Sequence, residues 1–127
     1  VGEYDDAMNR HQQSLAIRHD LGDRHGEAKS LAMLGSAAHK TGEYDDAREW
    51  YEAARDLFVD LGVINYELTV RQSLVKVERA VDAPIRARKR CEDALARLDG
   101  LDREFPDERE WFADVLGELN DAADAGD

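Results

Sequence analysis

The sequence predicts an all-α fold in which antiparallel helix pairs stack into a solenoid, and three observations support this prediction. The hexapeptide Gly-Glu-Tyr-Asp-Asp-Ala occurs at residues 2–7 and recurs at residues 42–47. The same register places alanine at positions 7, 47 and 87 and leucine at positions 21, 61 and 101. Apolar residues spaced three and four apart predict about six helices, and no segment alternates as a strand would.

The first three predicted helices each end at a glycine. The helix over residues 3–20 has an apolar-to-small stripe and stops before Gly22, since glycine readily takes the left-handed conformation that follows a helix. The helix over 24–40 ends before Gly42 in the same way. The helix over 43–60 has the most regular apolar stripe, which neighbouring helices must cover, and Gly62 ends it.

The C-terminal half has weaker helix signals. Residues 64–81 predict a helix rich in valine, whose lower helix propensity must be offset by packing. Asp82 is expected to be the N-cap of a helix that runs to about residue 98, because Pro84 then falls in the first turn, where its missing N–H costs nothing. A loop over 100–105, a closing helix within 106–122 and a frayed acidic tail at 123–127 complete the expected order.

This repeat resembles the tetratricopeptide repeat, most closely between residues 27 and 62. Leu31, Leu34 and Gly35 fit the first helix of that motif, and the second-helix positions hold Ala47, Tyr51 and Ala54. The 40-residue period is similar to the long-helix branch of the family. After residue 71 the resemblance weakens, because Val75 replaces the small residue and Glu78 replaces the aromatic one.

The resemblance implies one domain over residues 1–127, which starts in mid-repeat. Its expected parts are the second helix of a truncated repeat (1–22), a full repeat (23–62), a degenerate repeat (63–101), the closing helix (106–122) and the tail (123–127). The N-terminal helix of the chain lacks the first helix of its own repeat, which suggests that the sequence is a fragment of a longer chain.

The composition is acidic, with a formal net charge of -12 and only four lysines. Aspartate-rich, lysine-poor surfaces are halophile-like, although an acidic mesophilic domain remains an alternative. The negative field repels phosphates and anionic lipids, so neither nucleic acid nor a membrane is an expected partner. No apolar run approaches the length of a membrane span, and a cytoplasmic location is expected.

No motif indicates catalysis, a metal or a cofactor, so the protein is not expected to be an enzyme. The four histidines lack the i, i+4 spacing of a helical zinc site, and there is no phosphate-binding loop. His11 is expected to pack between helices, whereas His19 and His25 flank a turn and are expected to be solvated. The single cysteine, Cys91, is interpreted as a small core residue.

A protein–protein interaction module is the function that the resemblance implies, with the first helix of each pair lining a concave groove. The residues expected to line this groove are Lys29, Ser36, His39, Lys40, Gln72, Lys76 and Arg79. Three of the four lysines belong to this set, which favours an acidic or carboxylate-ending peptide as the partner. Alternatively, these lysines pair with neighbouring aspartates, a weak effect on exposed surfaces.

Two further surfaces carry expectations. A self-association or packing role within a longer regulatory protein is the alternative function, with weak homodimerisation through an N-terminal patch of Tyr4, Ala7, His11 and Ile17. The basic run at residues 86–90 falls on a second helix, hence on the convex side. It is expected to pair with the acidic neighbouring helix rather than to recognise a partner.

Overall fold

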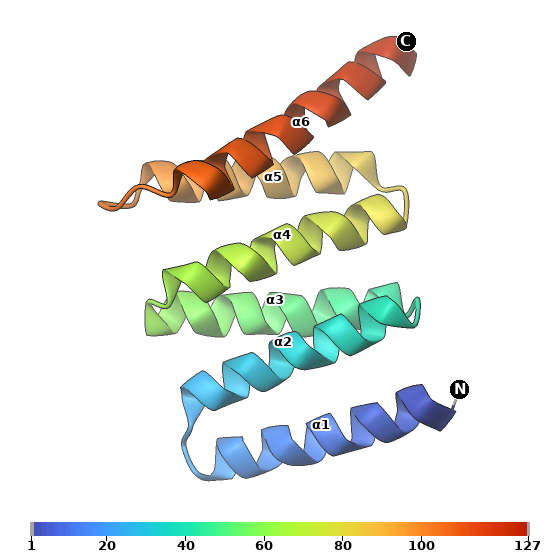
Figure 1. Cartoon of the computed structure of the whole chain (residues 1–127), viewed down its shortest axis with the longest axis vertical. Helices are drawn as coiled ribbons and strands as arrows, with labels where there is room; N and C mark the ends of the chain where they lie inside the picture. The colour runs from blue at the N-terminus through green and yellow to red at the C-terminus, as the bar shows by residue number, and fades with distance from the viewer. Residues whose placement is uncertain (1, 127) are drawn as a thin grey trace. The chain divides into compact units, whose positions relative to one another are not determined.

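The computed structural model describes residues 2–126, except for the side chains at positions 3, 4, 7 and 125. Within this range it contains six helices and no strand, so the predicted all-α class is confirmed (Figure 1). The helices are α1 (Gly2–Asp20), α2 (Arg24–Lys40), α3 (Tyr44–Leu61), α4 (Ile64–Ala80), α5 (Pro84–Asp99) and α6 (Pro106–Gly126).

Four turns of one geometry connect the first five helices and are evenly spaced along the chain. Each turn has one residue with positive φ: Gly22 (72°), Gly42 (80°), Gly62 (72°) and Asp82 (54°). The N–H of the next residue donates to the carbonyl five positions earlier, with N···O distances of 2.8, 2.8, 3.0 and 2.8 Å in the four turns. This bond closes the helix C-terminus in the manner of a Schellman motif, so one turn geometry accounts for the helix ends.

The fourth turn corrects the expectation for Asp82. The N-cap of α5 is Ala83, which has no side-chain acceptor, and Asp82 occupies the left-handed position that glycine holds in the other turns. Aspartate is one of the few non-glycine residues that adopt this conformation at modest cost. The sequence pattern favoured a cap because the aspartate side chain suits both roles.

The chain divides into two compact units, the first of which spans residues 1–73. In Figure 1, α1, α2 and α3 of this unit run in alternating directions. Ala47 and Ala54 of α3 are completely buried, and the ring of Tyr51 lies against Gly35 of α2, where an added Cβ would be 2.7 Å from the ring. The glycine of the repeat is therefore required by close approach of an aromatic ring.

The second unit spans residues 74–127 and has α5 and α6 antiparallel (Figure 1). Its core is formed by residues of the last turns of α4, of both later helices and of the loop between them: Leu74, Val75, Val77, Ala87, Cys91, Ala94, Leu98, Phe105, Phe112, Val115 and Leu119. One ion pair is buried among them, with Glu78 0% exposed and its Oε2 2.8 Å from Nε of Arg90.

The C-terminal helix is longer than the sequence predicted. It continues to Gly126, whereas the expectation placed a frayed tail after Ala122. Alanine is the strongest helix former and recurs here at positions 122, 123 and 125, which accounts for the extension. Asp127 lies outside the described residues.

Candidate functional site

Lys29, the first of the predicted groove residues, is exposed on α2 and lies over an aromatic ring. Its Nζ is 5.2 Å from the ring centroid of Tyr66, which belongs to α4. The Tyr66 ring stacks on Phe58 at 5.3 Å, and His25 packs edge-on against both rings. The expectation that His25 is solvated is therefore wrong: the helix start at Arg24 directs its ring toward the aromatic pair.

The other predicted groove residues of the first unit differ in accessibility. Lys40 is exposed at the end of α2, and His39 is half-buried with its ring 5.5 Å from that of Tyr44 in an edge-on contact. Gln72 is half-buried on α4.

Ser36 is also half-buried and, with Ser73, hydrogen-bonds the hydroxyl of Tyr51. Burial raises the pKa of Tyr51, and these two hydrogen bonds oppose that rise. Ser36 therefore stabilises the packing of Tyr51, and Lys29 and Lys40 are the exposed cations of this set.

Lys76 and Arg79 are both exposed on the part of α4 that belongs to the second unit. Nζ of Lys76 is 6.0 Å from the ring centroid of Trp111 on α6. Nη2 of Arg79 is 3.1 Å from Oε2 of Glu118, also on α6. Lys76 therefore lies over an aromatic ring, whereas Arg79 forms an ion pair with a carboxylate.

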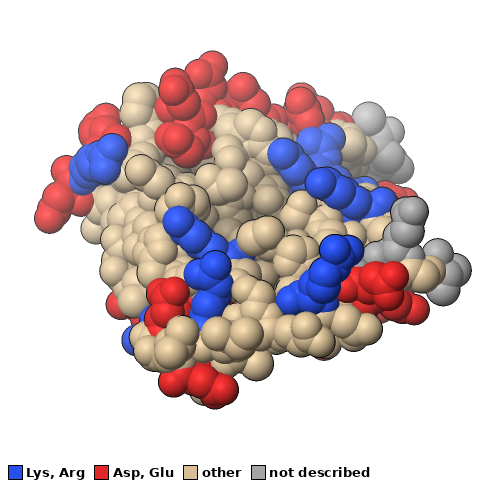
Figure 2. Space-filling model, turned by 60° about the horizontal axis from the view of Figure 1, so that its bottom comes forward, with Lys and Arg blue, Asp and Glu red and all other residues tan. Residues whose placement is uncertain are grey.

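The ion pairs separate the two explanations given for the lysines. Among the described residues, Lys89 pairs with Asp93 at 3.0 Å, whereas Lys29, Lys40 and Lys76 form no ion pair with a carboxylate. On the face drawn in Figure 2, several lysine or arginine side chains lie among uncharged residues, and some of them adjoin aspartate or glutamate. Relief of repulsion by pairing therefore describes Lys89, not the three lysines of the predicted groove.

The N-terminal patch is described only in part, because the side chains of Tyr4 and Ala7 lie outside the described residues. On the same helix, His11 is half-buried and Ile17 is 59% exposed. The structure thus leaves at least one large apolar side chain of this patch open to solvent.

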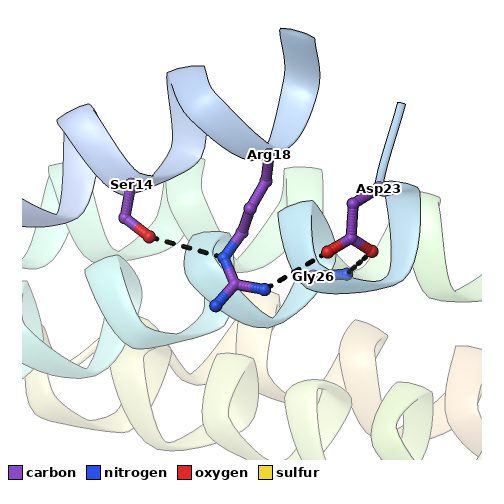
Figure 3. A network of polar contacts seen from close by, with 4 residues as sticks. All are labelled: Ser14, Arg18, Asp23 and Gly26. Carbon is purple, nitrogen blue, oxygen red and sulfur yellow. Dashed lines mark hydrogen bonds and ion pairs between the residues drawn. The ribbon is translucent and has the colours of Figure 1, made fainter. Parts of the chain in front are cut away.

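A polar network fixes the C-terminal end of α1 to the start of α2 (Figure 3). Asp23 accepts a hydrogen bond from the backbone N–H of Gly26 at 2.9 Å and meets Arg18 at 3.4 Å. Nε of Arg18 donates to Ser14, also at 3.4 Å. A side chain at Gly26 would collide with Arg18 and Asp23, so the cap depends on this glycine.

Two buried ion pairs were not predicted. Glu67 and Glu78 of α4 are both 0% exposed and lie 2.8 Å from Arg71 and Arg90, respectively. The i, i+4 spacing of Glu67 and Arg71 could have indicated a helical pair. The basic run was expected to pair with the acidic neighbouring helix, but the partner of Arg90 is Glu78, a buried residue of α4, and Lys89 pairs with Asp93 of its own helix.

The described residues contain no group of three or more histidine, cysteine, aspartate or glutamate side chains placed to hold a metal ion. Cys91 is fully buried, as expected for a core residue. Loss of solvation raises the pKa of its thiol to about 11, which disfavours the reactive thiolate.

These features define a helical-repeat protein in which three exposed lysines without an ion-pair partner among the described residues, Lys29, Lys40 and Lys76, lie on α2 and α4. Residues 1–58 match the family model described as tetratricopeptide repeat, and the assignment to the tetratricopeptide repeat family is confirmed for that part of the chain. No curated protein matches the chain. The described helices include none that is both long and apolar enough to cross a membrane.

The match over residues 1–58 indicates, in general terms, a module for protein–protein interaction. Such modules are typically not enzymes. The family match does not specify the chemistry of the partner, and only the distribution of charged side chains bears on it.

Proposed function

We propose that the chain binds an acidic peptide segment of a partner protein through the exposed cations of the first helices, α2 and α4. The observation that carries this proposal is that Lys29, Lys40 and Lys76 have no carboxylate partner among the described residues of a chain with net charge -12. A cation left without a carboxylate in such a field favours an anionic ligand. The proposal includes the whole predicted groove set, with Ser36 supporting Tyr51.

Aromatic rings beside two of these lysines support the same interpretation. Tyr66 is 43% exposed next to Lys29, and Trp111 is half-exposed next to Lys76. Each ring holds its lysine by a cation–π contact, worth about 0.5–1 kcal/mol at exposed sites, without neutralising the charge. The ammonium groups are thereby positioned while their attraction for a carboxylate is kept.

The test is a titration with an amide-capped peptide rich in glutamate, compared with the same peptide carrying glutamine. We expect the glutamate peptide to shift backbone amide NMR signals of α2 and α4. Lys29→Glu combined with Lys40→Glu should weaken its binding about tenfold, since exposed charge pairs contribute roughly 0.2–1 kcal/mol each. Equal binding of both peptides would contradict an acidic partner.

Lys89 provides the matched control. It is the remaining lysine, lies on α5 and is already paired with Asp93. Lys40→Glu and Lys89→Glu change the net charge equally, so non-specific electrostatic effects are the same in both. If Lys89→Glu weakens binding as much as Lys40→Glu, the surface formed by the first helices is not the site.

A second candidate function is self-association through the N-terminal patch, which the 59% exposure of Ile17 favours. Together with Tyr4, Ala7 and His11, this residue would form a weak two-fold contact. Sedimentation equilibrium should then show a monomer–dimer transition that Ile17→Ser weakens. A chain that remains monomeric at millimolar concentration would exclude this candidate.

A further inference from the structure

A crevice of about 670 Å³ lies within the second unit, between the beginning of α5 and the later half of α6. In Figure 1 this half of α6 diverges from α5, which runs antiparallel to it. The crevice volume falls within the range of pockets that bind small ligands, about 300–1,000 Å³. This crevice is distinct from the predicted groove, although Arg79 contributes to both.

The walls of the crevice are aliphatic. From α5 they include Pro84 and Ile85, and from α6 they include Leu119 and Ala122. Ile85 is 77% exposed, as much as any large apolar residue whose side chain the structure describes. An apolar surface of this kind, next to a polar group, is what a ligand with an aliphatic side chain requires.

Two arginines give the crevice a positive end. Arg79 and Arg88 both line it, together with the carboxylate of Asp82. Nε of Arg88 is buried and has no hydrogen-bond partner among the described residues. Arg79, in contrast, forms an ion pair with Glu118, with Nη2 and Oε2 3.1 Å apart. A buried donor without an acceptor is costly, so a ligand carboxylate that draws the Arg88 guanidinium into hydrogen bonds is favoured.

The start of α5 adds to this preference for an anion. Its N-cap residue, Ala83, lines the crevice and provides no side-chain acceptor for the first-turn N–H groups. These N–H groups form the positive end of the helix dipole. The guanidinium groups of Arg79 and Arg88 are nevertheless the principal cationic groups of the crevice. A guanidinium group matches a carboxylate in geometry, so these two side chains are expected to bind the carboxylate of the ligand.

We propose that this crevice binds a peptide segment in which a carboxylate side chain adjoins a large aliphatic side chain. The carboxylate accepts hydrogen bonds from Arg88 and competes with Glu118 for Arg79. The aliphatic side chain packs on Ile85 and Leu119. This site goes beyond the binding surface proposed for α2 and α4, because most of its residues lie on α5 and α6.

The test uses a synthetic peptide, acetyl-Ser-Gly-Glu-Leu-Leu-Gly-amide, titrated into the full chain and followed by backbone amide NMR shifts. We expect shifts at the start of α5 and in the later half of α6. Replacing glutamate by glutamine, or both leucines by serine, should weaken binding at least tenfold. Shifts confined to α2 and α4, or equal affinity of the three peptides, would overturn the proposal.

Arg88→Gln and Arg86→Gln form the matched pair of protein variants. Both remove one positive charge from α5, but only Arg88 lines the crevice. We expect about tenfold weaker binding with Arg88→Gln and less than a twofold change with Arg86→Gln. Similar losses in both variants would show that the net field of the helix, not the crevice, attracts the peptide.

Glu118→Gln gives a change in the opposite direction. It removes the carboxylate that shares Arg79, so the peptide should bind about two- to threefold more tightly. The variant concerns an exposed pair, and helicity by circular dichroism should be unchanged. Weaker binding in Glu118→Gln would contradict the competition for Arg79.

The same titration separates this site from the surface on α2 and α4. Lys40→Glu should leave the shifts of α5 and α6 unchanged, and Arg88→Gln should leave the shifts of α2 unchanged. Loss of both sets of shifts in either variant would contradict two independent sites.

Discussion

The second helices of the two repeats, α3 and α5, bury the same positions with different residues. In the repeat register, Ala47 matches Ala87 and Ala54 matches Ala94, and all four are completely buried. Between these alanines, Tyr51 of the first unit corresponds to Cys91 of the second, and both are buried. The comparison shows that the repeat preserves its buried positions while it changes the volumes that occupy them.

Those volumes change in compensating pairs. In the first unit a large ring, Tyr51, lies against the smallest residue, Gly35. At the equivalent positions of the second unit, Val75 stands in place of Gly35 and the much smaller Cys91 in place of Tyr51. Both residues are 0% exposed. The resemblance to the repeat therefore weakens at Val75 because both residues of this pair have changed in size, whereas the buried positions of the repeat are kept.

A second pair changes in chemistry instead of volume. Ala38 is completely buried and corresponds in the repeat register to Glu78, while Trp50 corresponds to Arg90. The first unit therefore has a small and an aromatic residue where the second has a buried ion pair of 2.8 Å. Burial of the Glu78–Arg90 pair costs the second unit desolvation energy, and the uncharged residues of the first unit do not have this cost.

The largest effect is expected from breaking this ion pair. Arg90→Met leaves Glu78 buried without the cation, which should lower the free energy of unfolding by about 3–5 kcal/mol. Urea denaturation measures this change. The exposed neighbour Arg86 provides the control, since Arg86→Met should remain within about 0.5 kcal/mol of the wild type.

Transplanting the first unit's solution should restore stability. Glu78→Ala combined with Arg90→Trp reproduces the residues of positions 38 and 50, and we expect this double variant to be more stable than Arg90→Met. If the double variant is the less stable of the two, the two units do not use interchangeable pairs.

The next effect concerns the glycine–tyrosine contact. Gly35→Val places a side chain within 2.7–2.9 Å of the Tyr51 ring, and overpacking of this kind costs about 1–3 kcal/mol. Adding Tyr51→Cys, the pair found in the second unit, should reduce the loss below the sum of the two single variants. A double-mutant cycle with no coupling energy would show that the volumes do not compensate.

A smaller effect is expected at the turns. Gly62→Ala forces a side chain into the left-handed conformation and should cost about 1 kcal/mol in the free energy of unfolding. Asp82→Gly gives the fourth turn the residue of the other three. It should change stability by less than about 1 kcal/mol, because relief of backbone strain opposes the entropy of an added glycine. Thermal unfolding of both variants checks this order.

The last effect is absent near neutral pH and concerns the thiol of the second unit. Burial raises the pKa of Cys91 from 9.0 to about 11, so the folded chain holds the proton more tightly than the unfolded chain. This contribution to stability is complete below pH 9 and is lost as the pH rises toward 11. The stability difference between the wild type and Cys91→Ala should therefore change across that window, and it should be constant from about pH 6 to about pH 8.

Alkylation provides an independent measurement. Below pH 9, a pKa of about 11 leaves about 100-fold less thiolate than the ordinary value, so iodoacetamide should react about 100-fold more slowly with the folded chain than with the urea-unfolded chain. Equal rates would show that Cys91 is accessible.

The sequence predicted those features that repeat. The bounds of α2 were predicted to the residue, and those of α3 within one residue at each end. Both helices end at a glycine and have an apolar stripe with a helical period, which are local signals. The groove set remains a prediction, with Lys29 and Lys40 exposed as its interpretation requires.

The features that the sequence did not predict depend on pairs of distant residues. A glutamate such as Glu78 is ordinarily a surface residue, and only the position of Arg90, 12 residues later, makes its burial possible. Likewise, His25 is covered in part by rings from two other helices, α3 and α4. Local periodicity contains no information on which side chains meet across helices.

The even spacing of the left-handed turns has a consequence for recombination. Leu21-Gly22 and Leu61-Gly62 are identical dipeptides in equivalent turns, separated by two helices. Deleting residues 23–62 would therefore join Gly22 to Val63 and recreate the Leu-Gly-Val sequence that connects α3 to α4. A gene of this kind can lose or duplicate a cassette that encodes one repeat without creating a new turn, and the junction would have a backbone geometry already present in the chain.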